Sequence, residues 1–139
     1  ILRAGLPLHQ GILNYFDRSD NAFISAYRKH SNGGKFEIKI EYMASPNLES
    51  KTLILCDPML ATGSSMVLAM EAILTRGTPK HIHIVSVISS IAGVNYVKEN
   101  IPIKNCTLWI GAEDTEMTTQ SYIVPGLGDA GDLSFGQKD

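Results

Sequence analysis

The spacing of apolar residues indicates a helix near the start of the chain. Between Pro7 and Asp17, the apolar positions Leu8, Ile12 and Phe16 recur every four residues, which places them on one side of a helix. Proline is tolerated in the first turn of a helix because its missing N–H has no intrahelical partner there. We therefore expect a helix over residues 7–17, after a short opening loop.

A strand period follows this helix. Residues 36–42 alternate apolar and charged side chains, which is the period of a strand with one face in water. Residues 21–27 also have strand character, and Ser31-Asn-Gly-Gly34 between the two segments is a turn signal. A strand with one polar face does not fit inside a sheet covered on both sides. The pattern therefore predicts a projecting β-hairpin over about residues 21–44.

From residue 52 onward, continuous apolar runs alternate with segments of helical period. Short continuous apolar runs are typical of parallel strands covered on both faces. The runs occupy residues 52–56, 82–88 and 106–110, with helical segments over 65–76 and 90–100 and a last short strand over 122–124. This alternation predicts an α/β fold, an open and mostly parallel sheet flanked by helices.

The length of 139 residues suits one ordinary domain, so we expect a single domain over residues 1–139. The chain opens on Ile1-Leu2 and reaches Arg3-Ala-Gly5 at once, which looks like a strand already at its end. We therefore expect that an N-terminal segment of the natural protein, and part of its fold, precedes this sequence.

Charge and cysteine content narrow the class of protein. The 12 basic and 14 acidic residues give a net charge of −2, which provides no basic field for holding nucleic acid. No apolar stretch approaches the roughly 20 residues needed to span a bilayer. Cys56 and Cys106 are too few and too far apart for a disulfide framework or a zinc pattern. These features favour a soluble, cytoplasmic protein without nucleic-acid or membrane partners.

The loop after the first apolar run carries candidate chemistry. Asp57 follows that run directly, at the edge of the sheet where ligands of open α/β folds bind. The sequence then continues Ala61-Thr62-Gly63-Ser64-Ser65 and enters the predicted helix. Hydroxyls, a glycine that allows close backbone approach and unpaired helix N–H groups together predict a cradle for a single phosphate. The alternative is an ordinary helix start capped by Thr62 or Ser64.

The stretch Val124 to Asp132, VPGLGDAGD, matches the glycine spacing of a dinucleotide site. Such a site needs its glycines to open a helix in an early βαβ unit, with an acidic residue about 20 positions later. Only eight residues follow Gly131, and we expect no helix there. The backbone of this stretch instead suits a small, flat polar ring, while the alternative is a surface tail that ends the domain.

Three stretches resemble uracil phosphoribosyltransferases. Asp57-Pro-Met-Leu-Ala-Thr-Gly63 resembles the family's phosphoribosyl-pyrophosphate loop, ILRAGL at residues 1–6 its pyrophosphate-side loop, and YIVPGLGDAGD at residues 122–132 its uracil-binding segment. The resemblance covers nearly the whole chain in family order. It implies a type I phosphoribosyltransferase-like fold and the conversion of uracil and 5-phosphoribosyl 1-pyrophosphate to UMP and pyrophosphate in pyrimidine salvage. It also implies Mg²⁺ as cofactor, a homodimer or higher homo-oligomer, and GTP as a candidate effector.

The same resemblance implies roles for individual residues. Arg3 would contact the pyrophosphate, with backbone from Ala4 and Gly5, and Arg28 would reach the same group from the hairpin. Asp57 would lie near the ribose hydroxyls, and Asp129 would hold a water or Mg²⁺ close to the ribose and pyrophosphate. The other implied substrate-binding residues are Ala61, Thr62, Gly63, Ser64 and Ser65 around the phosphate, and Tyr122, Ile123, Gly128 and Ala130 within a uracil-binding tail over about residues 122–136.

The chain departs from the family pattern at three places. Ser64 stands where members commonly have a second glycine, so its Cβ could crowd the phosphate or oppose a positive φ. Leu133 replaces a common arginine, and Lys29-His30 stand where acidic residues are usual. A non-catalytic UMP sensor that binds RNA is the alternative function, which the net charge of −2 disfavours. A degraded domain kept for subunit contacts is a third.

Other residues look chemical but are expected to be structural. His81 and His83 share one strand face without an acidic or cysteine partner nearby, so a metal site is disfavoured. Trp109 lies in an apolar run and is expected in the core. The acidic segment Glu113-Asp-Thr-Glu116 is expected to be a solvated turn.

Overall fold

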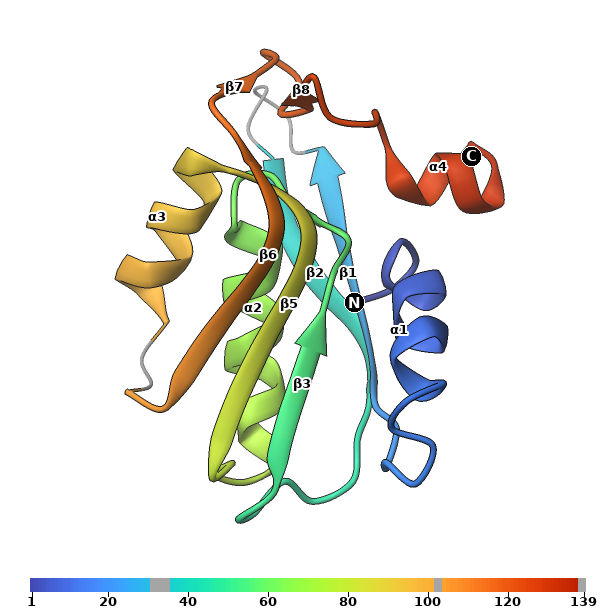
Figure 1. Cartoon of the computed structure of the whole chain (residues 1–139), viewed down its shortest axis with the longest axis vertical. Helices are drawn as coiled ribbons and strands as arrows, with labels where there is room; N and C mark the ends of the chain where they lie inside the picture. The colour runs from blue at the N-terminus through green and yellow to red at the C-terminus, as the bar shows by residue number, and fades with distance from the viewer. Residues whose placement is uncertain (31–35, 102–103, 138–139) are drawn as a thin grey trace.

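A computed structural model describes residues 1–30, 36–101 and 104–137, and its arrangement confirms the α/β class (Figure 1). The helices are α1 (Gly5–Leu13), α2 (Ser64–Ile73), the 3-10 turn η1 (Leu74–Arg76), α3 (Ile91–Asn100) and α4 (Ala130–Phe135). The strands are β1 (Phe23–His30), β2 (Phe36–Ala44), β3 (Thr52–Cys56), β4 (Met59–Leu60), β5 (His81–Ser90), β6 (Cys106–Asp114), β7 (Glu116–Met117) and β8 (Ile123–Val124).

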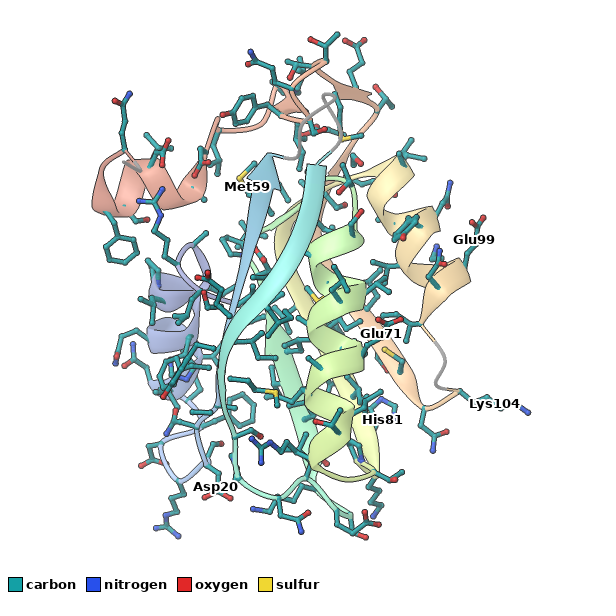
Figure 2. The ribbon with its side chains drawn as sticks, turned by 180° about the vertical axis from the view of Figure 1, so that it is seen from behind. Asp20, Met59, Glu71, His81, Glu99 and Lys104 are labelled. Carbon is teal, nitrogen blue, oxygen red and sulfur yellow. The ribbon has the colours of Figure 1, made fainter. Side chains whose placement is uncertain are left out.

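The parallel sheet is built around β5. This strand pairs with β3 on one side and β6 on the other, and the short β4 pairs with its last residues. Figures 1 and 2, which view the chain from opposite sides, place α2 on one face of the sheet. Alternate residues of β5, such as Ile82 and Ile84, are fully buried. They share one hydrophobic core with the α2 residues Met66, Met70 and Ile73. The apolar runs therefore form the core, as the sequence pattern indicates.

The predicted hairpin is present as the antiparallel pair β1 and β2. Its register runs from Phe23 opposite Ala44 to His30 opposite Phe36, with an irregularity between Ser25 and Ala26. The open end of the hairpin packs on α2, and Ile24 is buried in the core. The expected turn at 31–34 lies outside the described residues, and projection of the hairpin stays a prediction.

Three sequence-based expectations are wrong. The first helix ends at Leu13 instead of continuing to residue 17, and Tyr15 is 86% exposed, so the segment beyond has no face to bury. Trp109 is 55% exposed, because the face of β5 and β6 opposite α2 is left partly open. The glycine-rich tail contains the six-residue helix α4, where no helix was expected.

Within the part of the chain that the structure describes, every helix is too short or too polar to cross a bilayer.

Candidate functional site

The predicted phosphate loop connects the carboxyl end of β3 to α2. Gly63 adopts φ +79°, and a Cβ there would lie 2.8 Å from the carbonyl oxygen of Gly93, so this position requires glycine. Gly63 is the N-cap of α2 and offers no side chain to the first N–H groups of the helix. The hydroxyl of Thr62 donates to Ser64 Oγ at 3.2 Å. Two hydroxyls and the positive end of a helix dipole thus converge on one place, which favours an anion.

The backbone at Ser64 does not adopt the positive φ that its Cβ would oppose. Ser64 is the first residue of α2, and it is not among the residues with a positive φ. The left-handed conformation falls one position earlier, at Gly63. The expectation of a forbidden φ at Ser64 is therefore wrong, while crowding of a bound phosphate by its side chain stays a prediction.

Asp57 lies half-buried just beyond the end of β3. Desolvation raises the pKa of its carboxyl from 3.8 to about 6, against the opposing effects of the Ile1 ammonium and of a hydrogen bond from the backbone N–H of Met59. That N–H donates to Asp57 Oδ1 at 3.3 Å. Ionised Asp57 therefore lowers the stability of the fold, and ionisable groups with shifted pKa values are common at functional sites.

The opening loop lies against this carboxyl. The amine of Ile1 donates to the carbonyl oxygen of Cys56 at 2.8 Å, and a Cβ on Gly5 would lie 3.2 Å from the same oxygen. Leu2 forms a parallel bridge to Ser25 of β1. Arg3 and Ala4 are therefore held at the carboxyl edge of the sheet, beside Asp57.

Arg3 connects the opening loop to the C-terminal tail. Its guanidinium forms an ion pair with Asp132 and donates a second hydrogen bond to the carbonyl oxygen of Gly136. Its Nε is buried without a hydrogen-bond partner among the described residues. A Cβ on Gly131 would lie 3.2 Å from that Nε and 3.1 Å from Asp129 Oδ1. The structure thus brings Arg3 and Asp129 around one glycine, although 126 positions separate them in the sequence.

Asp129 also starts α4. Its Oδ1 accepts the backbone N–H of Asp132 at 2.9 Å, which satisfies one of the unpaired donors at the start of the helix. Asp132 was not singled out from the sequence, because no helix was expected there. Once α4 is recognised, an acidic residue in its first turn is the signal that would have found it.

The tail forms a tight turn that needs its glycines. A Cβ on Gly126 would lie 2.1 Å from the carbonyl oxygen of Ile123, and Gly128 adopts φ +81°. Ile123 and Ala130 are buried, whereas Tyr122 is partly exposed. The short pairing of β8 with β7 holds the start of this turn. Because α4 has only six residues, the glycines build a turn and not the long helix start of a dinucleotide site.

Some of the predicted residues are not brought into this group. Arg28 lies in β1 opposite Ile38, but its side chain is outside the description, so its role stays a prediction. His81 lies toward the opposite end of the sheet from Met59, which follows β3 closely in the sequence (Figure 2). His81 Nε2 is 2.8 Å from Thr107 Oγ1, and Trp109 Nε1 donates to His83 Nδ1 at 3.1 Å. Both histidines therefore have structural partners.

Comparison with known proteins shows the family of the chain. The family model described as Uracil phosphoribosyltransferase matches residues 1–137. Uracil phosphoribosyltransferases of Porphyromonas gingivalis and Methanothermobacter thermautotrophicus are 59% and 40% identical over 99% of this chain, which covers 63% and 61% of their own lengths. The chain thus spans less than two thirds of these relatives.

Solved structures show the same fold. A protein of Aquifex aeolicus superposes with a TM-score of 0.86 at 32% identity, over 97% of this chain and 62% of its own. A hypoxanthine phosphoribosyltransferase from Staphylococcus aureus superposes at 0.60 with 16% identity, over 98% of this chain and 76% of its own, which concerns the fold alone. With the family match over residues 1–137, these findings show that the chain belongs to the uracil phosphoribosyltransferase family.

Proposed function

We propose that this chain forms the substrate site of a pyrimidine-salvage enzyme that converts uracil and 5-phosphoribosyl 1-pyrophosphate to UMP and pyrophosphate. The observation that carries the proposal is the contact of Arg3 with the turn around Asp129, while the opening loop that holds Arg3 lies against the strand end before Asp57. These residues come from the three stretches that resemble the family's motifs.

The 5-phosphate of the ribosyl group would bind at the start of α2. Thr62, Gly63 and Ser65 would supply a hydroxyl and backbone N–H groups, and Ala61 and Ser64 would complete the loop around the phosphate. The N-terminus of α2, whose N-cap Gly63 has no side chain, supports this placement because it favours a negative charge.

The pyrophosphate would bind at Arg3, with backbone N–H groups of Ala4 and Gly5 beside it. The buried, unpartnered Nε of Arg3 supports this role, since a buried donor without an acceptor has a bond to offer. Asp132 already holds part of the guanidinium, so its charge is oriented before substrate arrives. Arg28 would add a second positive charge from the hairpin.

Uracil would lie against the tail. Backbone groups of Ile123, Gly128 and Ala130 can match the alternating acceptors and donor of the ring edge, with Tyr122 beside them. The left-handed conformation at Gly128, with no atom within 4 Å of the place where a Cβ would lie, supports a close approach of ligand to backbone.

The reaction needs no covalent intermediate. Uracil N1 attacks the anomeric carbon, the bond to the pyrophosphate oxygen breaks, and the N1 proton passes to water. A loose, cationic sugar transition state makes alignment of the two substrates and stabilisation of the leaving group the main contributions of the protein. Arg3 stabilises the departing pyrophosphate, and an ionised Asp57 near the ribose stabilises the cationic sugar.

The carboxylates present fit Mg²⁺ as cofactor. Within the described ranges, no three His, Cys, Asp or Glu side chains gather into a metal-binding group. Mg²⁺ suits such a site because it keeps several waters and takes one or two carboxylates plus substrate oxygens. Asp129 would hold it through water. When bound, Mg²⁺ supplies charge neutralisation on the pyrophosphate.

The proposal extends to a cytoplasmic homodimer or higher oligomer, with GTP as a candidate effector. The exposed side chains of Val87 and Trp109 on the open sheet face support subunit contacts. No observation on the described residues favours the RNA-binding sensor.

The test is the rate of UMP formation from uracil, 5-phosphoribosyl 1-pyrophosphate and Mg²⁺. It should be run on the 139-residue chain and on a longer, extended form that matches the relatives in length. We expect UMP with uracil and no IMP with hypoxanthine. A folded, extended protein that binds phosphoribosyl pyrophosphate but makes no UMP would refute the catalytic proposal.

A further inference from the structure

We propose that Ser90 and Gly93, at the start of α3, are positioning residues that hold the phosphate loop in its binding shape. Neither residue lies in a stretch that resembles a substrate motif, and neither contacts the proposed position of the phosphate directly. The inference rests on the proposed function, because it assigns a role in binding phosphoribosyl pyrophosphate.

Ser90 makes two hydrogen bonds in opposite directions. Its hydroxyl donates to the carbonyl oxygen of Ala61 at 2.6 Å, and its oxygen accepts the backbone N–H of Gly93 at 2.9 Å. Ser90 is the last residue of β5 and the N-cap of α3, and it is 1% exposed. The side chain that starts α3 therefore also fixes the loop that precedes α2.

Gly93 lets the loop approach α3 closely. A Cβ there would lie 2.3 Å from the carbonyl oxygen of Ala61 and 2.6 Å from that of Leu60, far inside van der Waals contact. The contact from the other side is also close, since a Cβ on Gly63 would lie 2.8 Å from the carbonyl oxygen of Gly93. The starts of α2 and α3 are thus packed backbone against backbone at two glycines.

These contacts fix the direction of the groups that would bind phosphate. Ala61, Thr62 and Gly63 form the turn into α2, and the hydrogen bond from Ser90 holds the first of them. Without it, the carbonyl oxygen of Ala61 would be buried with one partner fewer, and the turn would gain alternative conformations. A loop that must be ordered on binding gives weaker affinity, so Ser90 should act on binding of the phosphoribosyl substrate and not on binding of uracil.

The experiment compares Ser90→Ala with Ser90→Thr, which retains a hydroxyl. Ser86→Ala is the matched control, because Ser86 is also a buried serine of β5, and its hydroxyl donates to the carbonyl oxygen of Ile88 in the same strand instead of to Ala61. For each protein, the dissociation constant of 5-phosphoribosyl 1-pyrophosphate with Mg²⁺ is measured by calorimetry, together with the thermal midpoint and the KM for uracil. Ser90→Gly provides a second variant if Ser90→Ala does not fold, because glycine is tolerated at an N-cap.

We expect Ser90→Ala or Ser90→Gly to weaken phosphoribosyl-pyrophosphate binding about tenfold, the scale of one lost hydrogen bond, with the KM for uracil unchanged. Ser90→Thr should stay within about twofold of the unaltered chain. Equal affinity in Ser90→Ala, or an equal loss in Ser86→Ala, would overturn the inference while the proposed function stands. Absence of binding by the unaltered chain would instead refute the proposed function, and this inference with it.

Discussion

Replacing Asp57 by Asn should stabilise the folded chain at neutral pH by about 3 kcal/mol. The pKa of this carboxyl rises from 3.8 to about 6 on folding, mainly because burial removes water from it. A shift of roughly two units corresponds to about 3 kcal/mol between the two protonation states. Asn retains an oxygen that can accept the N–H of Met59, so the substitution removes the charge and keeps that hydrogen bond.

The stabilisation by Asn should depend on pH in a defined direction. Because the pKa of Asp57 is higher in the folded state, its contribution to stability is fully present below pH 3.8 and is lost as the pH rises through about 6. The advantage of the Asn variant in free energy of unfolding should therefore grow from about 1.6 kcal/mol at pH 5 to about 3 kcal/mol at pH 8.

Urea unfolding of both proteins at pH 5, 6, 7 and 8 measures this difference directly. Asp20→Asn is the matched control, since Asp20 is an exposed aspartate paired with Lys51, and its loss should change stability by less than about 1 kcal/mol. A difference between Asp57→Asn and the unaltered chain that does not change with pH would refute the reasoning. The same variant should bind phosphoribosyl pyrophosphate more weakly, as expected of a group that the fold retains for function at a cost in stability.

Two further predictions concern glycine packing and the arginine. Gly93→Ala should cost about 2 kcal/mol or more of stability, because a Cβ would force the loop carbonyls away. Gly11→Ala, at a position in α1 with open space for a Cβ, should stabilise the chain by a few tenths to about 1 kcal/mol. Thermal unfolding measures both effects, and similar effects of the two variants would contradict the packing at Gly93. Arg3→Ala should lower the rate of UMP formation by about 100-fold or more through lost stabilisation of pyrophosphate. Asp132→Asn, which removes the ion pair and keeps the arginine, should cost less, and equal losses would mean that Arg3 acts through the tail.

The sheet and its helices could be predicted from sequence because their signals are local. Continuous apolar runs fixed β3 at residues 52–56, and the helical period located α2 within a few residues of Ser64–Ile73. The exposure of Trp109 could not be predicted, since an apolar run does not reveal whether elements cover both faces of its sheet. The helix α4 was missed because its glycine content disfavours a helix, and its contacts with Arg3 come from the other end of the chain.

The site was predictable only where a recognisable stretch carried it. Arg3, Asp57 and Asp129 stand in such stretches, but the proximity of Arg3 and Asp129 depends on how the two ends of the chain meet. The contacts of Ser90 and Gly93 with Ala61 join positions about 30 residues apart. They arise from the packing of α2 beside α3, and no local pattern of residues encodes them.

The most direct test of the account is a titration of the ¹⁵N-labelled 139-residue chain with UMP, followed by backbone amide chemical shifts. UMP carries both the phosphate and the uracil, so one saturable event should shift Gly63, Ser64 and Ser65 together with Ile123, Gly128 and Ala130. Amides of α1 around Gly11 should not respond. Shifts confined to one of the two stretches, or found only elsewhere, would contradict the claim that the loop and the tail form a single site.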